Sequence, residues 1–192
     1  MTPLEFLNSR RSTPSRQLGE PGPDPAQLDA LLAAAVRVPD HGKLTPWRLI
    51  LIRGDARRRL GERLADLHKR IEPDIGDSAL TKDRERYTFA PLILVVVART
   101  DPGHAKVPEQ EQTLSAGNVA YNLLLAAHAL GFGAQWLTGW AAYDRQAAAL
   151  FDLAPNERIV GFVHVGTAAS PVPERARPNV ADLVSDLPPL SS

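Results

Sequence analysis

A continuous run of apolar residues near the middle of the chain restricts the fold more than any other segment. Residues 92–98 read Leu-Ile-Leu-Val-Val-Val-Ala, with no polar side chain. Successive side chains of a strand point to opposite faces of its sheet, so a strand of this composition is buried on both faces. We therefore expect a central strand whose sheet is covered by other elements on both sides.

Three further segments predict the remaining strands of this sheet. They cover residues 47–53, 134–137 and 158–165, and each is short and largely apolar. Strands and helices alternate irregularly along the chain, and several connections are long. The pattern therefore favours an α+β fold with a small central sheet between helices over a doubly wound parallel sheet. We expect one domain over residues 1–192.

Capping signals and apolar periodicity predict the helices. Thr2-Pro3-Leu4-Glu5 forms a capping box with proline at the first helical position, and Leu4 and Leu7 provide the apolar side of this helix. Asp24-Pro25 opens a second helix in the same way. The predicted helices cover residues 3–10, 25 to before Pro39, 56–71, 108–130 and 143–153.

The helix over residues 108–130 carries too many apolar positions for a surface helix, so we expect it to be the buried central helix. Residues 72–87 show no clean period, and we expect an irregular or mobile segment there. After Gly166 the chain becomes rich in proline and extended. Such an arm stays ordered only where it is tied down, for instance on a partner subunit.

The composition excludes several classes of function. The chain has no cysteine, which excludes disulfides, thiolate metal sites and cysteine nucleophiles. Its 22 basic and 22 acidic residues balance, so no overall field attracts nucleic acid or an anionic membrane. No apolar run approaches the ~20 residues of a membrane span, and the first residues lack the pattern of a secretory signal. A cytoplasmic location is the expectation.

The segment Arg10-Arg11-Ser12 is the first candidate for a binding site. A phosphate dianion is bound by two cations together with hydroxyl or backbone donors, and the planar guanidinium group matches its oxygens. The alternative is a solvated basic helix end that interacts favourably with the helix dipole. These three residues alone do not decide between the two interpretations.

Two loops are further candidates. Residues 37–47 join a helix to a strand through a polar loop that ends in Pro46-Trp47, and they can present donors to a planar ligand. The alternative is an ordinary connection whose tryptophan fills the core. Gly131-Phe-Gly133 follows a helix and opens a strand, whereas a dinucleotide-binding motif follows a strand and opens a helix.

No residue pattern indicates a side-chain catalyst. The five histidines are scattered without metal-ligand spacing; we interpret His164 as structural, and His68 lies on the polar side of its helix. No Gly-x-Ser-x-Gly motif is present, and no acid–base pair has a spacing that indicates catalysis. We therefore predict no catalytic side chain and no metal, as in flavin enzymes, in which the cofactor carries the chemistry.

Several motifs in a fixed order resemble the nitroreductase family, in particular its minimal YdjA-like subgroup. The matching segments are Arg10-Arg11-Ser12, Arg37-Val-Pro-Asp-His41 with Pro46-Trp47, Ala90-Pro91, Lys106-Val-Pro108 with Glu111-Gln112, Ser115-Ala-Gly117, Gly131-Phe-Gly133 with Trp136, and Ile159-Val-Gly-Phe162 with Gly166-Thr167. Each motif is weak alone, but the ordered set runs across nearly the whole chain.

The resemblance implies a nitroreductase-like fold with a mostly antiparallel sheet, whose extended C-terminal arm completes the partner subunit. It also implies a homodimer with FMN at the subunit interface and NADPH or NADH as electron donor. By matching position, the implied FMN-binding residues are Arg10, Arg11, Ser12, Trp136, Leu137 and Thr138, with Arg37 and His41 reaching the flavin held mainly by the other subunit. The implied NAD(P)H contacts are Ala126, Ala127, His128, Ala129, Leu130 and Gly131.

The implied reaction is a ping-pong transfer of two electrons from NAD(P)H to nitroaromatic, quinone-like or other electron-poor small molecules. The chain departs from the family pattern at Lys43 and Thr45, where larger members often carry Asn and Gln before Pro-Trp. Arg175 or Arg177 stands where larger members have a phosphate-binding cation. Two alternatives stay open: a flavin dehydrogenase or dehalogenase on the same scaffold, and a non-catalytic flavin-binding or interaction protein.

Overall fold

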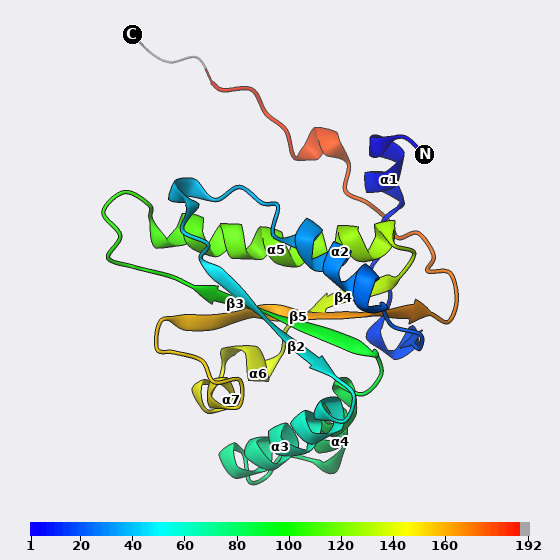
Figure 1. Ribbon diagram of the computed structural model, residues 1–192, viewed down its shortest axis with the longest axis vertical. Coiled ribbons are helices and arrows are strands. Elements are labelled where there is room, and N and C mark those ends of the chain that lie inside the picture. Colours follow the sequence, from blue (N-terminus) through cyan, green and yellow to red (C-terminus); the bar gives the residue numbers. More distant parts are fainter. Residues whose placement is uncertain (189–192) are drawn as a thin grey trace.

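Antiparallel pairing joins all five strands of one sheet in the computed structural model, which describes residues 1–188 (Figure 1). The order is β1-β5-β3-β2, and β4 also pairs with β5. The strands are β1 (Leu18–Gly19), β2 (Trp47–Arg53), β3 (Leu92–Arg99), β4 (Gly133–Leu137) and β5 (Glu157–Ala168). This topology confirms the expected α+β class and the mostly antiparallel sheet.

Helices cover both faces of the sheet. Helices α2 and α5 lie on one side, and α3, α4, α6 and α7 lie on the other (Figure 1). The helices are α1 (Pro3–Ser9), α2 (Pro25–Ala35), α3 (Ala56–Ile71), α4 (Asp77–Arg86), α5 (Glu109–Ala129), α6 (Trp140–Tyr143) and α7 (Arg145–Ala149). Three short 3-10 helices are η1 (Ser15–Gln17), η2 (His41–Lys43) and η3 (Val180–Asp182).

Strand β3 is the central strand that its composition predicts. Leu94 and Val96 belong to the core on the α5 side, whereas Val95 and Val97 belong to the core on the α3 side. All four side chains are fully buried. Removal of each from water contributes about 1.5–3 kcal/mol before the entropy of folding is counted.

Helix α5 is the buried helix on its side of the sheet, as expected. Its small residues Ala116 and Ala120 are fully buried in the same core as Leu31 and Ala35 of α2. Small side chains at these positions let the two helices approach closely. Among the described residues, no helix has the length and apolar character that crossing a membrane requires.

Helix α1 has the predicted capping box but a different orientation. Thr2 Oγ1 accepts from the Glu5 amide at 3.2 Å, and Glu5 Oε2 accepts from the Thr2 amide at 2.7 Å. Leu4 and Leu7, expected to form the packed side, are 72% and 46% exposed. Phe6 and Ser9 instead face α5, where both contact His128. The apolar side of α1 is therefore free to contact another molecule.

The prediction of an irregular segment at residues 72–87 was wrong, because α4 occupies most of it. Helix α4 packs on α3 at Gly61, where a Cβ would collide with the Arg84 carbonyl oxygen. Its buried residues include the polar Asp83 beside Leu80, so hydrophobic periodicity could not detect it. The helix predicted over residues 143–153 is shorter than expected: α7 covers only Arg145–Ala149, begins after Asp144, which caps it through the Ala147 amide, and follows the separate helix α6.

The end of the sheet is longer than predicted. Strand β5 continues to Ala168 because its last residues pair with β1. Strand β1 has only two residues, and no sequence pattern predicts it. Beyond it, residues 173–188 are exposed and form an extended arm with η3. The arm lies on the same side of the sheet as α1 and α5 (Figure 1).

Candidate functional site

The segment after Arg10-Arg11-Ser12 lies along strand β4. The Thr13 amide donates to the Ala134 carbonyl at 2.9 Å, and the Ser15 amide donates to Gln135 Oε1 at 2.6 Å. Gly133 allows this contact, since a Cβ there would lie 2.8 Å from Thr13 Oγ1. The paired arginines are thereby held beside the first residues of β4, and the predicted ring-lining residues follow at its other end.

The Arg10–Ser12 segment forms a positively charged corner. Arg10 Nη1 donates to Ser12 Oγ at 3.3 Å, and no carboxylate within residues 1–188 forms an ion pair with Arg10. Arg11 donates to the Asn8 carbonyl and forms an ion pair with Glu174 of the arm. Burial, and then the charges of Arg10 and Arg11, lower the pKa of His128 below its ordinary value. Arg10 and Ser12 have fewer interactions within the chain than Arg11, so they are more available to bind an anion.

The other end of β4 carries the predicted Trp136, Leu137 and Thr138. Trp136 Nε1 donates to the Val160 carbonyl at 3.3 Å, and its indole occupies the space in which a Cβ of Gly161 would lie. Two residues beyond the end of β4, Gly139 has a φ of 148° and a ψ of −179°, which are open only to glycine. A Cβ at this position would collide with the Arg86 guanidinium.

A cavity of about 460 Å³ opens at this end of β4, and Leu137 and Gly139 line it. The three cations Arg16, Lys82 and Arg86 also line it, and none of them forms an ion pair with a carboxylate of residues 1–188. A cavity with uncompensated cations suits a ligand that carries or gains negative charge. It also leaves room for the edge of a planar ring beside the β4 backbone.

Several residues of this cavity were not predicted from the sequence. Arg86 and Lys82 lie on α4, the helix that periodicity did not detect, and Arg16 lies just beyond the paired arginines. His68 and Asp83 also line the cavity and are joined by a 2.6 Å hydrogen bond. The interpretation of His68 as a residue on the polar side of its helix is therefore corrected, because its side chain is only 16% exposed.

His41 lies far from this corner within one chain, whereas the Arg37 carbonyl accepts from Asn122 in the second half of α5 at 3.1 Å. His41 Nδ1 is 2.8 Å from Glu111 Oε2 near the start of α5, whereas Ser9 contacts His128 near its end. These two α5 residues are 17 positions apart, which at ~1.5 Å per residue is about 25 Å. Both Arg37 and His41 are exposed. One chain therefore does not bring His41 to the Arg10–Ser12 segment.

The predicted NAD(P)H segment has mixed exposure. Ala126 and Ala127 are buried in the core, and His128 Nε2 is 2.9 Å from Ser9 Oγ. Ala129 and Gly131 are exposed at the end of the helix. Contact with a nicotinamide cofactor stays a prediction for this segment, and only its last residues present side chains or backbone to solvent.

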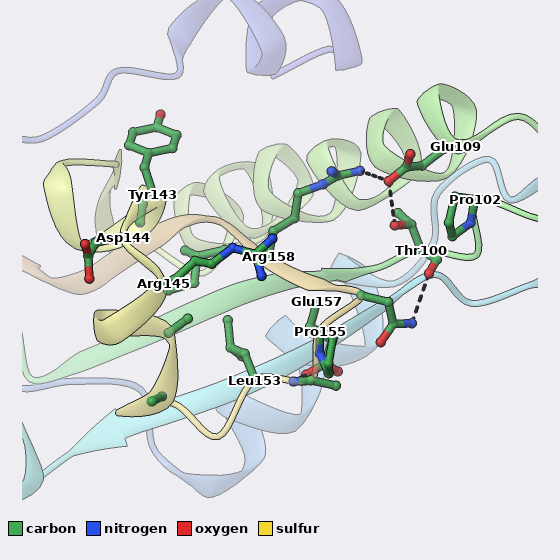
Figure 2. Close-up of a pocket in the computed structure, with 16 residues that line it drawn as sticks. Thr100, Pro102, Glu109, Tyr143, Asp144, Arg145, Leu153, Pro155, Glu157 and Arg158 are labelled. Carbon is green, nitrogen blue, oxygen red and sulfur yellow. Dashed lines mark hydrogen bonds and ion pairs between the residues drawn. The ribbon is translucent and has the colours of Figure 1, made fainter.

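A cavity of about 650 Å³ lies elsewhere, at the start of β5 beside α6 and α7 (Figure 2). Three of its charged groups already have partners, since Arg158 pairs with Glu109 and Glu157 pairs with Arg48. Arg145 also lines it and forms no ion pair within residues 1–188. The hydrogen bond from Thr100, followed by those from Arg158, lowers the pKa of Glu109. None of the predicted site residues lines this cavity. We therefore assign the site to the smaller cavity at the end of β4.

No group of three or more histidine, aspartate or glutamate side chains within residues 1–188 is arranged to hold a metal ion. Together, the described geometry consists of a cationic corner at Arg10–Ser12 and a cationic cavity at Gly139. Strand β4 links the two.

Comparison with known proteins gives consistent matches over most of the chain. Residues 7–167 match the nitroreductase family. The chain is 36% identical over 167 residues to a provisionally named NAD(P)H nitroreductase of Haemophilus influenzae, with 87% of this chain and 89% of that protein covered. It is 37% identical to the similarly named YdjA of Escherichia coli K12, with 87% and 88% covered.

Solved structures share the fold. A nitroreductase-like family protein from Bacillus cereus superposes with a TM-score of 0.82 at 21% identity, covering 98% of this chain and 97% of that chain. A provisionally named nitroreductase from Desulfovibrio desulfuricans, solved in complex with FMN, superposes with a TM-score of 0.74 at 24% identity, covering 98% of each chain.

Proposed function

The chain belongs to the nitroreductase family, and from this premise we propose that it is an FMN-dependent NAD(P)H oxidoreductase. It passes two electrons to electron-poor small molecules, such as nitroaromatic or quinone compounds. The observation that carries the proposal is the pair of cationic sites at the two ends of β4. FMN has a phosphate at one end and a planar ring at the other, and the Desulfovibrio desulfuricans relative was solved with FMN.

The residues at the two ends of β4 fit this cofactor. Arg10, Arg11 and Ser12 provide cations and a hydroxyl for the phosphate. Gly139 leaves room for the Arg86 guanidinium beside β4, and the cavity next to it gives a ring access to Leu137. The nearby Arg16, Lys82 and Arg86 stabilise the negative charge that the ring gains on reduction.

FMN, when bound, supplies the hydride chemistry between the nicotinamide and the acceptor. The role of the protein is to hold the ring, place positive charge at its edge and leave one side open to small molecules. No side chain of the chain has to form a covalent bond with a substrate.

The separated position of His41 supports a homodimer. If two chains pair through α5 in antiparallel orientation about a twofold axis, His41 of one chain comes to the end of α5 where Arg10 of the other lies. Apolar side chains are exposed on α1, α5 and the arm, which share one side of the sheet (Figure 1). They include Leu4, Leu7, Leu114, Tyr121, Leu183 and Leu187.

The first test is the absorption spectrum of the purified protein before and after addition of NADPH or NADH without oxygen. We expect a yellow protein that is bleached by the nicotinamide. A colourless protein that cannot be loaded with FMN would contradict the proposal. Bound FMN that stays oxidised with both nicotinamides would indicate a non-catalytic flavin-binding protein.

The second test compares Arg10→Ala with Arg70→Ala. Arg70 is exposed near the end of α3 and forms no ion pair with residues 1–188, so it is a matched control for loss of a cation. We expect Arg10→Ala to weaken FMN binding by about tenfold or more, since charge-assisted hydrogen bonds contribute about 1.5–3 kcal/mol each. Equal FMN dissociation constants for the two variants would show that Arg10 is only a solvated helix end.

A further inference from the structure

One buried carboxylate in the cavity joins three elements that are distant in the sequence. Asp83 of α4 is 7% exposed. Its Oδ2 lies 2.6 Å from His68 Nδ1 of α3, and its Oδ1 accepts from Trp140 Nε1 of α6 at 2.9 Å. The rings of His68 and Trp140 also pack together, with their centroids 4.3 Å apart. All three residues line the cavity beside Gly139.

This arrangement orients the imidazole of His68. A carboxylate that accepts from Nδ1 holds the proton on that nitrogen, which leaves Nε2 free to exchange a proton. The imidazole ring cannot turn freely, because Asp83 holds one edge and Trp140 covers one face. The same contacts fix the side chain of Trp140. Trp140 directly follows Gly139 and is therefore next to the proposed position of the flavin ring.

The charged groups around His68 come from α3, α4 and the N-terminal segment. Glu72, one turn further along α3, is exposed and has its Oε2 3.7 Å from His68 Nε2. From α4, Asp83 faces the imidazole, and Lys82 and Arg86 line the same cavity. Arg16 lines it from the N-terminal segment, and the uncharged Trp140 faces His68 from α6. His68 Nε2 thus faces an exposed carboxylate, while the side chain also lines the cavity.

We propose that His68, oriented by Asp83, supplies the proton that accompanies the hydride to the acceptor. The inference rests on the proposed function. With a quinone as acceptor, NAD(P)H loses a hydride by way of the flavin and becomes NAD(P)⁺. The quinone gains this hydride and one proton from protonated His68, which makes the hydroquinone. His68 then regains a proton from water on the side of Glu72.

The experiment compares two oxidants of the reduced, FMN-loaded protein in stopped flow. Quinone reduction consumes a proton, whereas ferricyanide takes electrons without one. We expect His68→Gln to slow re-oxidation by p-benzoquinone about 100-fold, which is within the usual contribution of a positioned acid. Reduction by NADPH and re-oxidation by ferricyanide should be unchanged, and the solvent deuterium isotope effect on the quinone step should be lost.

Two variants complete this comparison. Asp83→Asn should slow the quinone step in the same selective way, because the amide keeps the shape of the carboxylate but not its charge. Glu85→Gln is the control, since it removes an exposed carboxylate from the same helix. If His68→Gln does not fold, Asp83→Asn tests the same prediction. Equal slowing with both oxidants would reduce His68 to a structural role, and an unchanged quinone rate would overturn the proposal.

A measurement without turnover tests the pair itself. In FMN-free protein, proton NMR should show a far-downfield imidazole N–H signal from the short His68–Asp83 hydrogen bond. The signal should vanish in His68→Gln and in Asp83→Asn and persist in Glu85→Gln. Its absence from the wild-type protein would overturn the proposal. A failure of NADPH to reduce the bound flavin would instead contradict the proposed oxidoreductase.

Discussion

Single residues shape the cavity at the end of β4 through the atoms that they lack. Gly133 lets the N-terminal segment lie on the strand, and Gly139 leaves room for the Arg86 guanidinium. His164 is the opposite case, because here a side chain is present where the core offers it no partner. It is fully buried, and its two ring nitrogens have no hydrogen-bond partner within residues 1–188. At Gly139 and at His164, the change of one side chain has a measurable consequence.

Gly139→Ala should destabilise the FMN-free protein and weaken FMN binding. Its backbone conformation is restricted to glycine, and the new Cβ would displace Arg86. We expect a loss of about 1–3 kcal/mol in the free energy of unfolding, measured by urea denaturation. Gly54→Ala is the control, because Gly54 has a φ of 58° but open space around its Cβ position. If Gly54→Ala costs as much, the contact with Arg86 has no energetic role.

His164→Leu should stabilise the protein, because it removes a buried polar group that costs about 1–3 kcal/mol when unsatisfied. Burial, with a smaller contribution from Arg86, lowers the pKa of His164 to about 4. The unfolded chain binds a proton near its ordinary pKa of about 6.5, so wild-type stability falls as the pH drops from about 6.5 to 4. Urea denaturation at pH 7.5 and pH 5 should show a smaller loss in the variant. The same loss in both proteins would contradict this account.

Pairs of elements are held together by contacts that short sequence windows do not contain. Helix α4 packs on α3 through Gly61, and Trp140 ties α6 to α4 through Asp83. Across β3, Arg48 of β2 donates to both carboxylate oxygens of Glu157 on β5, at 2.7 and 2.8 Å. These hydrogen bonds, with smaller contributions from the Ala154 amide and Arg99, lower the pKa of Glu157 against the effect of its burial.

Glu157→Gln should lower the free energy of unfolding by roughly 2 kcal/mol at pH 7, since charge-assisted hydrogen bonds are worth about 1.5–3 kcal/mol. The folded pKa is lowered, so the contribution is present above the ordinary glutamate pKa of about 4.3 and is lost as the pH falls through the folded pKa. The difference between variant and wild type should therefore shrink below pH 4. Glu62→Gln, which breaks an exposed pair with Arg58, is the control and should have little effect.

At the scale of the whole molecule, the candidate site is divided between the two ends of α5. The Arg10 corner and the His41 loop lie about 25 Å apart along this helix. If FMN contacts both, the cofactor must lie between two chains. Light scattering should then give the mass of a dimer, and a monomer that binds FMN tightly would contradict the shared site.

Mixed dimers give a sharper test of the shared site. In a dimer of one Arg10→Ala chain and one His41→Ala chain, one site carries both substitutions and the other carries neither. We expect purified mixed dimers to retain about one FMN per dimer, while both parent homodimers bind FMN weakly at each of their equivalent sites. Weak binding by the mixed dimer as well would show that Arg10 and His41 do not serve the same flavin.

The sequence by itself determined the elements whose signals are local. The uninterrupted apolar run of β3, the capping boxes of α1 and α2 and the apolar length of α5 are each contained in one short window. The ordered motifs likewise identified the family, because they are spread over nearly the whole chain. The grouping of Arg10–Ser12 with Trp136, Leu137 and Thr138 as FMN-binding residues depended on that resemblance more than on any single motif.

Only the tertiary structure decided which polar residues are buried and what they face. Asp83 and His68 look like solvent-facing residues in the sequence, because burial of a polar side chain depends on partners from other elements. For the same reason the sequence of α4 had no recognisable hydrophobic period. The sequence also did not indicate that Leu4 and Leu7 are exposed in one chain. The distance between Arg10 and His41 is set by the length of α5, which sequence order along the chain does not reveal.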